Sequence, residues 1–114
     1  MKIEKFEDII AWNKAKTLTL RIYHVFKTSK DYSFKDQIQR AYVSIMNNIS
    51  EGFERRSNKE FIHFLYISKG SCGEVRSMLS LGKDLNYIDE AEYAKLNNMT
   101  LEISKILSGF IKIL

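Results

Sequence analysis

Residues Gln37 to Ser57 read QIQRAYVSIMNNISEGFERRS, and this stretch decides the fold class that the sequence predicts. At about 100° per residue, its apolar residues cover one broad side of a helix: Ala41, Tyr42, Val43, Ile45, Met46 and Ile49. The remaining side is a narrow polar stripe: Gln37, Arg40, Ser44, Asn47, Asn48 and Glu51. A helix of this kind packs its apolar side against other helices. The heptad-like spacing of the polar stripe suits contact with another helix as well as with solvent.

Helix start signals divide the rest of the chain. Three capping residues are each followed by an acidic residue three positions later, a pattern that covers the free amides of a first helical turn: Ser33 with Asp36, Ser57 with Glu60, and Asp89 with Glu92. Asn86 suits the left-handed position that ends a helix. These signals predict helices over Glu7–Thr28, Phe34–Phe53, Asn58–Leu85 and Glu90–Ile113. Because the connections are short, we expect an all-α, antiparallel, up-down-up-down four-helix bundle that forms one domain over residues 1–114.

The composition agrees with long helices and few loops. The 114 residues include no proline, which ordinarily stiffens turns and stops helices, and a hydrophobic content of 45% excludes a disordered chain. The lone Cys72 cannot form an internal disulfide. The sequence shows neither a signal peptide nor an apolar run of about eighteen residues. We therefore expect a cytoplasmic protein that does not associate with membranes.

The third predicted helix has more apolar residues than one helix of a monomeric bundle can bury. The first and fourth predicted helices have single apolar seams, which read as core. In the third, the apolar residues point in nearly every direction: Phe61, Ile62, Phe64, Leu65, Tyr66 and Ile67. A helix that is apolar all round is normally buried all round, so this pattern predicts a homo-oligomer. Gly70 and Gly73 follow in mid-helix, where small residues indicate a close approach of backbones.

No set of catalytic or metal-binding residues is recognisable. Glu60 and His63 have the Glu-x-x-His spacing of a di-iron bundle, but such a site needs a second pair and two more glutamates. Cys72 has no evident base partner and is expected to be a buried structural thiol. We therefore expect a protein that is not an enzyme and has no metal or cofactor.

Basic residues outnumber acidic ones, 18 to 14, which gives a net charge of +4. Residues 1–31 hold seven basic and four acidic side chains. Arg55 and Arg56 follow the end of the second predicted helix, where they suit either the negative end of the helix dipole or a phosphate group. Glu51 and Glu74 are alternative partners that would hold these arginines in ion pairs.

The order of these motifs resembles a known family, the bacterial four-helix bundle proteins first noticed as reading frames within 23S rRNA intervening sequences. The matching stretches are FEDIIAWNKA (6–15), Tyr23, QIQRAYVSIMNNISEGFERRS (37–57), Glu60-Phe61, Phe64-Leu65 and KGSCGE (69–74). One departure is the loop before the second helix, which usually contains proline and here reads SKDYSFKDQ. The chain is also similar to the accessory proteins of diversity-generating retroelements, which are pentameric and associate with a reverse transcriptase and nucleic acid.

The resemblance implies an antiparallel four-helix bundle that assembles into a ring-shaped homo-oligomer, a homopentamer, and it supplies no enzymatic activity. Transferred by position, the family's polar signature comprises Gln37, Arg40, Ser44, Asn48, Glu51, Arg55, Ser57, Ser71 and Glu74.

Two hypotheses of function follow. The leading one is a non-enzymatic oligomer that binds structured RNA, such as rRNA, through Arg55 and Arg56. Secondary contacts in this hypothesis are Lys2, Lys5, Lys14 and Lys16. The alternative is a protein-interaction scaffold, in which the polar signature fixes the register of the subunits and the outer surface docks a partner protein.

Overall fold

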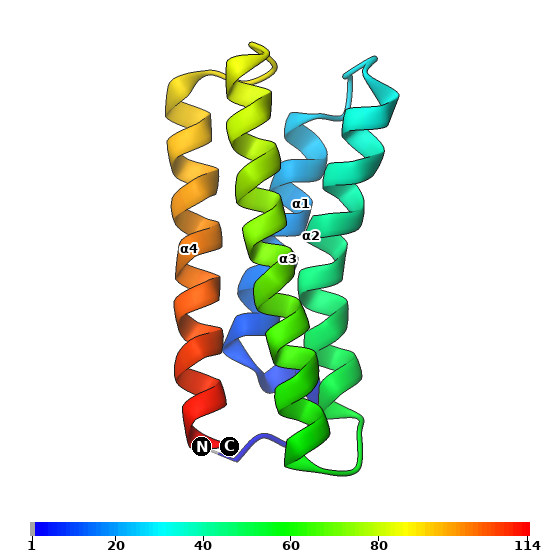
Figure 1. Ribbon diagram of the computed structural model, residues 1–114, viewed down its shortest axis with the longest axis vertical. Coiled ribbons are helices and arrows are strands. Elements are labelled where there is room, and N and C mark those ends of the chain that lie inside the picture. The colour runs from blue at the N-terminus through cyan, green and yellow to red at the C-terminus, as the bar shows by residue number, and fades with distance from the viewer. Residues whose placement is uncertain (1) are drawn as a thin grey trace.

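The computed structural model describes residues 2–114, and in this part of the chain every regular element is a helix. A short 3-10 helix, η1 (Phe6–Asp8), precedes α1 (Ile10–Val25), α2 (Tyr32–Phe53), α3 (Asn58–Asp84) and α4 (Glu90–Ile113). Successive helices run in opposite directions, so both termini lie at the same end of the molecule (Figure 1). The predicted all-α, up-down-up-down arrangement of four helices is confirmed.

The start signals of the last two helices act as the sequence predicted. The Ser57 hydroxyl accepts a hydrogen bond from the Glu60 amide at 3.2 Å, and the Asp89 carboxylate accepts one from the Glu92 amide at 2.8 Å. Asn86 has a φ of 63°, which confirms the left-handed stop after α3.

The predicted start of α2 is wrong by two residues. Asp31, rather than Ser33, caps the helix and accepts a hydrogen bond from the Phe34 amide at 3.1 Å. The hydroxyl of Tyr87, from the α3–α4 connection, also donates to Asp31 at 2.6 Å. Both hydrogen bonds lower the pKa of the Asp31 carboxyl below its usual value, and the bond from Tyr87 has the larger effect. A contact across the bundle therefore selects the capping residue, and the local sequence around Ser33 does not show it.

The first helix also differs from its prediction over Glu7–Thr28. The Asp8 carboxylate accepts hydrogen bonds from the amides of Glu4 and Lys5, which closes a short turn before the helix. Ile9 then has extended backbone angles, φ −80° and ψ 120°, so the α-helix begins only at Ile10.

The core lies between the four helices and contains the residues of the predicted seams. Fully buried side chains come from every helix and include Leu18, Ile22, Ile45, Ile49, Leu65, Leu79, Leu96, Ile103 and Leu107. No helix in residues 2–114 carries an apolar stretch long enough to cross a membrane.

The packing of α2 against α3 is unusually close at one point. A Cβ atom placed on Gly52 would lie 2.7 Å from the Cβ of Phe64 and 2.9 Å from the Phe61 ring. Further along the same contact, the buried Ser68 hydroxyl donates to the carbonyl of Ile45 at 2.7 Å. Gly52 is therefore a position at which the two helices leave no room for a side chain.

The close approach predicted at Gly70 and Gly73 is wrong within the chain, because a Cβ at either position would meet nothing within 4 Å. Both glycines lie on the outer surface of α3. The apolar residues of this helix divide as well: Phe61 and Leu65 are buried, whereas Tyr66 remains 58% exposed and Ile67 40% exposed. The apolar residues of α3 that the core does not bury are therefore exposed on the surface of the chain.

Gly52→Ala is expected to lower the free energy of unfolding by about 1–3 kcal/mol, because the added methyl group has no room between α2 and Phe64. Urea denaturation at fixed protein concentration measures the change. Gly70→Ala is the matched control, since it adds the same group to a helix in open space and should raise stability by up to about 1 kcal/mol. Equal effects of the two substitutions would contradict the assignment of the close contact.

Candidate nucleic-acid interface

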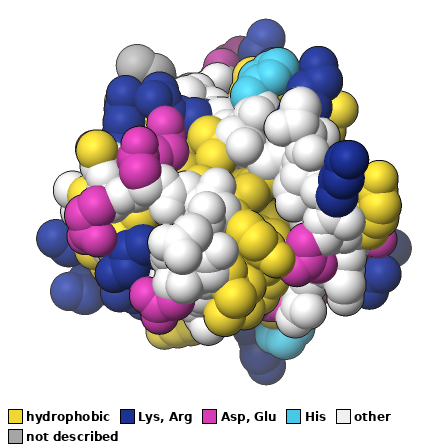
Figure 2. Space-filling view, turned by 90° about the horizontal axis from the view of Figure 1, so that it is seen from above, with side chains coloured by type: hydrophobic (Ala, Val, Ile, Leu, Met, Phe, Trp, Pro, Cys, Tyr) yellow, Lys and Arg dark blue, Asp and Glu magenta, His cyan; other side chains and the backbone are white. Residues whose placement is uncertain are grey.

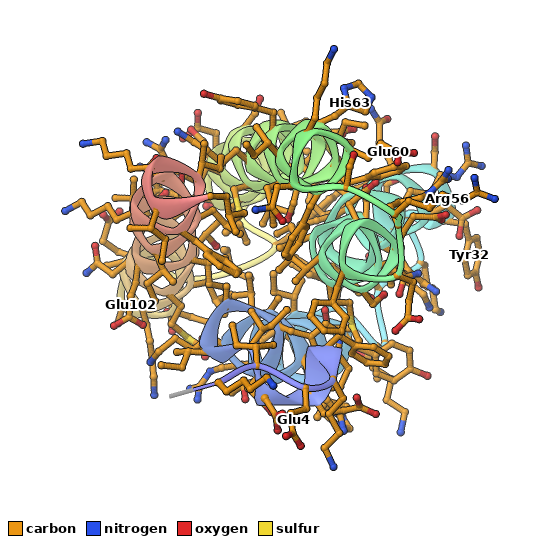
Figure 3. The ribbon with its side chains drawn as sticks, turned by 90° about the horizontal axis from the view of Figure 1, so that it is seen from below. Glu4, Tyr32, Arg56, Glu60, His63 and Glu102 are labelled. Carbon is orange, nitrogen blue, oxygen red and sulfur yellow. The ribbon has the colours of Figure 1, made fainter. Side chains whose placement is uncertain are left out.

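Arg55 and Arg56 lie in the connection between α2 and α3, at the end of the bundle that also holds both termini. Arg55 forms an ion pair with Glu51 at 2.8 Å, and its guanidinium lies 4.6 Å from the centre of the Phe64 ring. Arg56 points away from the bundle (Figure 3) and forms no ion pair within residues 2–114. Of the two predicted contacts, Arg56 therefore carries the more available charge.

The four lysines proposed as secondary contacts do not gather on one surface. Lys2 and Lys5 are exposed beside η1. Lys14 faces α4 and forms an ion pair with Glu102 at 3.2 Å. The ammonium of Lys16 lies 5.4 Å from the centre of the Trp12 ring.

The polar signature forms a continuous seam along the outer edge of the α2–α3 contact. At its middle, the Asn48 amide donates to both the carbonyl and the hydroxyl oxygen of Ser44, each at 2.8 Å. The Ser71 hydroxyl donates to the same Ser44 oxygen at 2.9 Å, which ties α3 to α2. Ser57 lies apart from this network and acts as the cap of α3.

Toward the α1–α2 connection the seam opens into a polar cleft of about 340 Å³, lined by Ser33, Asp36, Gln37, Arg40 and Glu74. Arg40 and Glu74 are both exposed, and neither forms an ion pair in the part of the chain that the structure describes. Glu51 thus holds Arg55 as one alternative predicted, whereas Glu74 holds neither arginine. Asp36 is exposed and unpaired as well, so the cleft presents three charged side chains without an ion-pair partner in residues 2–114.

A basic surface that the sequence analysis missed runs along α3 and α4. Lys69, Arg76 and Lys83 are spaced seven residues apart and so follow one side of α3. The Lys69 ammonium donates to the Ser108 hydroxyl at 2.7 Å, and Arg76 donates to the side-chain carbonyl of Asn97 at 3.2 Å. Both partners belong to α4 and are neutral, so these contacts orient the two cations without cancelling their charge.

Lys105 and Lys112 extend this surface on α4, where both are exposed. Neither forms an ion pair among the described residues, and the nearby Glu102 is engaged by Lys14 of α1. Lys83, by contrast, pairs with Glu90 at 3.9 Å. We call the surface formed by Lys69, Arg76, Lys105 and Lys112 the α3–α4 basic face.

Both ends of the bundle carry charged side chains of both signs. At the end formed by the α1–α2 and α3–α4 connections, acidic and basic side chains are interspersed around apolar ones (Figure 2). At the other end, Arg55 is paired with Glu51, and Glu54 is exposed beside it. The seven-residue spacing on α3 was visible in the sequence, but the neutral partners on α4 were not.

The remaining candidates from the sequence are Glu60, His63 and Cys72, and their surroundings are those of structural residues. Glu60 takes part in capping α3, where its carboxylate accepts a hydrogen bond from Ser57 at 3.3 Å. His63 is exposed, with its ring edge-on to Phe64 at 5.5 Å between centres. No group of three His, Cys, Asp or Glu side chains suited to a metal ion occurs in residues 2–114. Cys72 is fully buried, and this burial raises the pKa of its thiol to about 12.

Comparison with known proteins gives a family and a structural relative. Residues 7–109 match the model of the family described as 23S rRNA-intervening sequence protein. A crystal structure from Bacteroides thetaiotaomicron is similar over 90% of this chain and 99% of the other, with 29% sequence identity and a TM-score of 0.84. That relative is described as a protein with unknown function from the S23 ribosomal protein family. No curated protein matches the chain.

The Cys72 thiol is expected to react slowly with an alkylating reagent in the folded protein. A pKa of about 12 leaves only a trace of the reactive thiolate near neutral pH, and the fraction rises only as the pH approaches that value. Mass spectrometry after timed alkylation measures the rate. The same chain in denaturing urea is the control and should react at the rate of an ordinary cysteine, whereas fast labelling of the native protein would contradict the burial of Cys72.

Proposed function

Because the chain belongs to the 23S rRNA-intervening sequence protein family, we propose that it is a non-enzymatic cytoplasmic protein that binds structured RNA, such as rRNA, as a homo-oligomer. The observation that supports this proposal is the α3–α4 basic face. It offers four cations without a carboxylate partner in the described part of the chain, along one side of two adjacent helices.

The chemistry of this face suits phosphate groups. Bonds to Ser108 and Asn97 hold Lys69 and Arg76 in place, so less side-chain freedom is lost when a ligand binds. The Arg76 guanidinium keeps its terminal N–H groups for a phosphate, since only its Nε contacts Asn97. Contacts of this kind release counterions from the nucleic acid, so affinity should fall steeply with salt.

The oligomeric part of the proposal rests on apolar side chains that the chain leaves exposed. Between α1 and α4, near both termini, lies an apolar groove of about 530 Å³. Ile10 and Ile113 line it and are 65% and 80% exposed. On α3, Ile67 is exposed beside the polar signature. Burial of such residues is the main driving force of protein association.

A ring requires two different contact faces on each subunit. Viewed along the bundle, the helices follow one another around the axis, so that the α1–α4 groove and the α2–α3 seam lie on opposite sides (Figure 3). Subunits joined through these two faces form a closed ring if the rotations from each subunit to the next add up to a full turn. The ring that we propose is a homopentamer. The α3–α4 basic face then stays free, and several copies in one ring bind RNA with increased avidity.

A second candidate function is that of a protein-interaction scaffold. The observation that favours it is the polar cleft, where Arg40 and Glu74 are exposed without ion-pair partners. Opposite charges side by side suit a partner surface with complementary charges and would fix the register of the contact.

Replacing Lys69 and Arg76 by glutamine is expected to weaken RNA binding and to reduce the slope of log affinity against log salt by about one per residue. Fluorescence anisotropy with a labelled rRNA hairpin at several salt concentrations measures both quantities. Each substitution is also made singly, and Lys16→Gln is the matched control for the single variants, because it removes one positive charge from α1.

The connection between α2 and α3 is the rival site in this experiment. If Arg56→Gln reduces the slope and the α3–α4 variants do not, RNA binds at that connection. If the unaltered protein binds no RNA at low ionic strength, the proposed function is wrong.

Arg40→Ala is expected to weaken subunit assembly, since it removes one charge of the cleft that faces the neighbouring subunit in our proposal. Light scattering as a function of protein concentration measures the mass of the particle. Arg76→Ala, which removes an exposed arginine from another face, should leave the mass unchanged. An Arg40→Ala protein that keeps its mass and loses RNA binding would show that Arg40 contacts RNA instead.

A further inference from the structure

We propose that the α3–α4 basic face binds unpaired nucleotides of RNA, and that Tyr66 is the platform on which a base stacks. This inference rests on the proposed RNA binding and goes beyond it, because it specifies the class of RNA and a residue that contacts a base. Four observations carry it: the exposure of Tyr66, its position beside Lys69, the open backbone next to it, and the absence of ion pairs at Lys69 and Arg76 within residues 2–114.

Tyr66 is 58% exposed and forms no hydrogen bond through its side chain and no ring contact with another aromatic residue within residues 2–114. An aromatic ring in this position contributes little to the core of its own chain. Water covers much of its apolar surface, so a flat apolar ligand gains free energy by displacing that water.

The position of Tyr66 places it on the same side of α3 as the cations. Residues three and four apart on a helix are neighbours on its surface. Tyr66 is followed by Lys69 three residues later, by Gly73 after four more and by Arg76 after another three. The positions of Tyr66, Lys69 and Arg76 therefore lie along one side of α3, about 15 Å from the first to the last at 1.5 Å per residue. A phosphate on Lys69 would lie within reach of a base on Tyr66.

The helix surface next to these residues has no side chains at two positions, Gly70 and Gly73. A Cβ on Gly70 or Gly73 would meet nothing within 4 Å, so both glycines leave bare helix backbone beside the Tyr66 ring. Each glycine lowers helix stability by about 1 kcal/mol relative to alanine, and packing within the chain gives no reason for either. A base that stacks on Tyr66 would find room there for its sugar.

Stacking on an exposed ring distinguishes unpaired from paired RNA. In an A-form duplex both faces of each base are covered by neighbouring bases, so a protein contacts only the phosphates and the shallow minor groove. In a loop or a single strand the base faces are accessible, and proteins bind them with aromatic side chains beside a positively charged track. Tyr66, Lys69 and Arg76 correspond to the second arrangement.

The test compares Tyr66→Ala and Tyr66→Phe by fluorescence anisotropy. The probes are a labelled single-stranded RNA of about ten nucleotides and the same RNA annealed to its complement. We expect the unaltered protein to bind the single strand at least about tenfold more tightly than the duplex. Tyr66→Ala should lower affinity for the single strand by about 5- to 50-fold without a change in the salt slope, because no charge is removed. Tyr66→Phe keeps the ring and should bind within about twofold of the unaltered protein.

Tyr32→Ala is the matched control, since Tyr32 is 65% exposed but lies at the start of α2, away from the α3–α4 basic face. Its single-strand affinity should be unchanged, and thermal melting should show that every variant is folded. If Tyr66→Ala binds like the unaltered protein while the Lys69 and Arg76 variants lose affinity, stacking is refuted and RNA binding stands. Equal affinity for duplex and single strand also refutes the inference. If no RNA binds at low salt, both proposals fail.

Discussion

The close packing of α2 against α3 is the constraint on which the rest of the molecule depends. Gly52 lets the two backbones approach, and Ser68 meets the Ile45 carbonyl within the same contact. A buried hydroxyl without such a partner would be costly, so this bond favours one register of the two helices. That register brings Ser71 against Ser44 and turns the opposite side of α3 toward α4.

The two exposed seams of α3 consequently have different chemistry. Toward α2, charges of both signs alternate with hydroxyl and amide groups, and Arg55 is neutralised by Glu51. Toward α4, Lys69 and Arg76 are held by neutral groups and keep their charge. A cation bound to a carboxylate is neutralised, whereas a cation bound to a neutral group is not. This difference distinguishes a surface suited to another protein subunit from one suited to phosphate. One helix can serve both roles because its two sides face different neighbours.

Several parts of the fold could be predicted from short-range rules. The caps at Ser57 and Asp89 and the left-handed Asn86 depend on residues close in sequence, and all three were predicted correctly. The start of α2 was not, because Asp31 is fixed by Tyr87 from a distant connection. The candidate site shows the same limit: basic residues can be counted in a sequence, but Lys14 proved to be paired with Glu102 and Lys69 with a serine.

The sequence by itself determined that the chain forms helices, where most of them end and which family they belong to, since periodicity, capping and motif order are local properties. Only the tertiary structure decided which cations have a carboxylate partner and which glycines lie at a close contact. Gly52 and Gly70 look alike in the sequence, yet one lies against Phe64 and the other faces open space. The reason is physical: both the charge available to a ligand and the space around a residue depend on neighbours that the fold brings from distant parts of the chain.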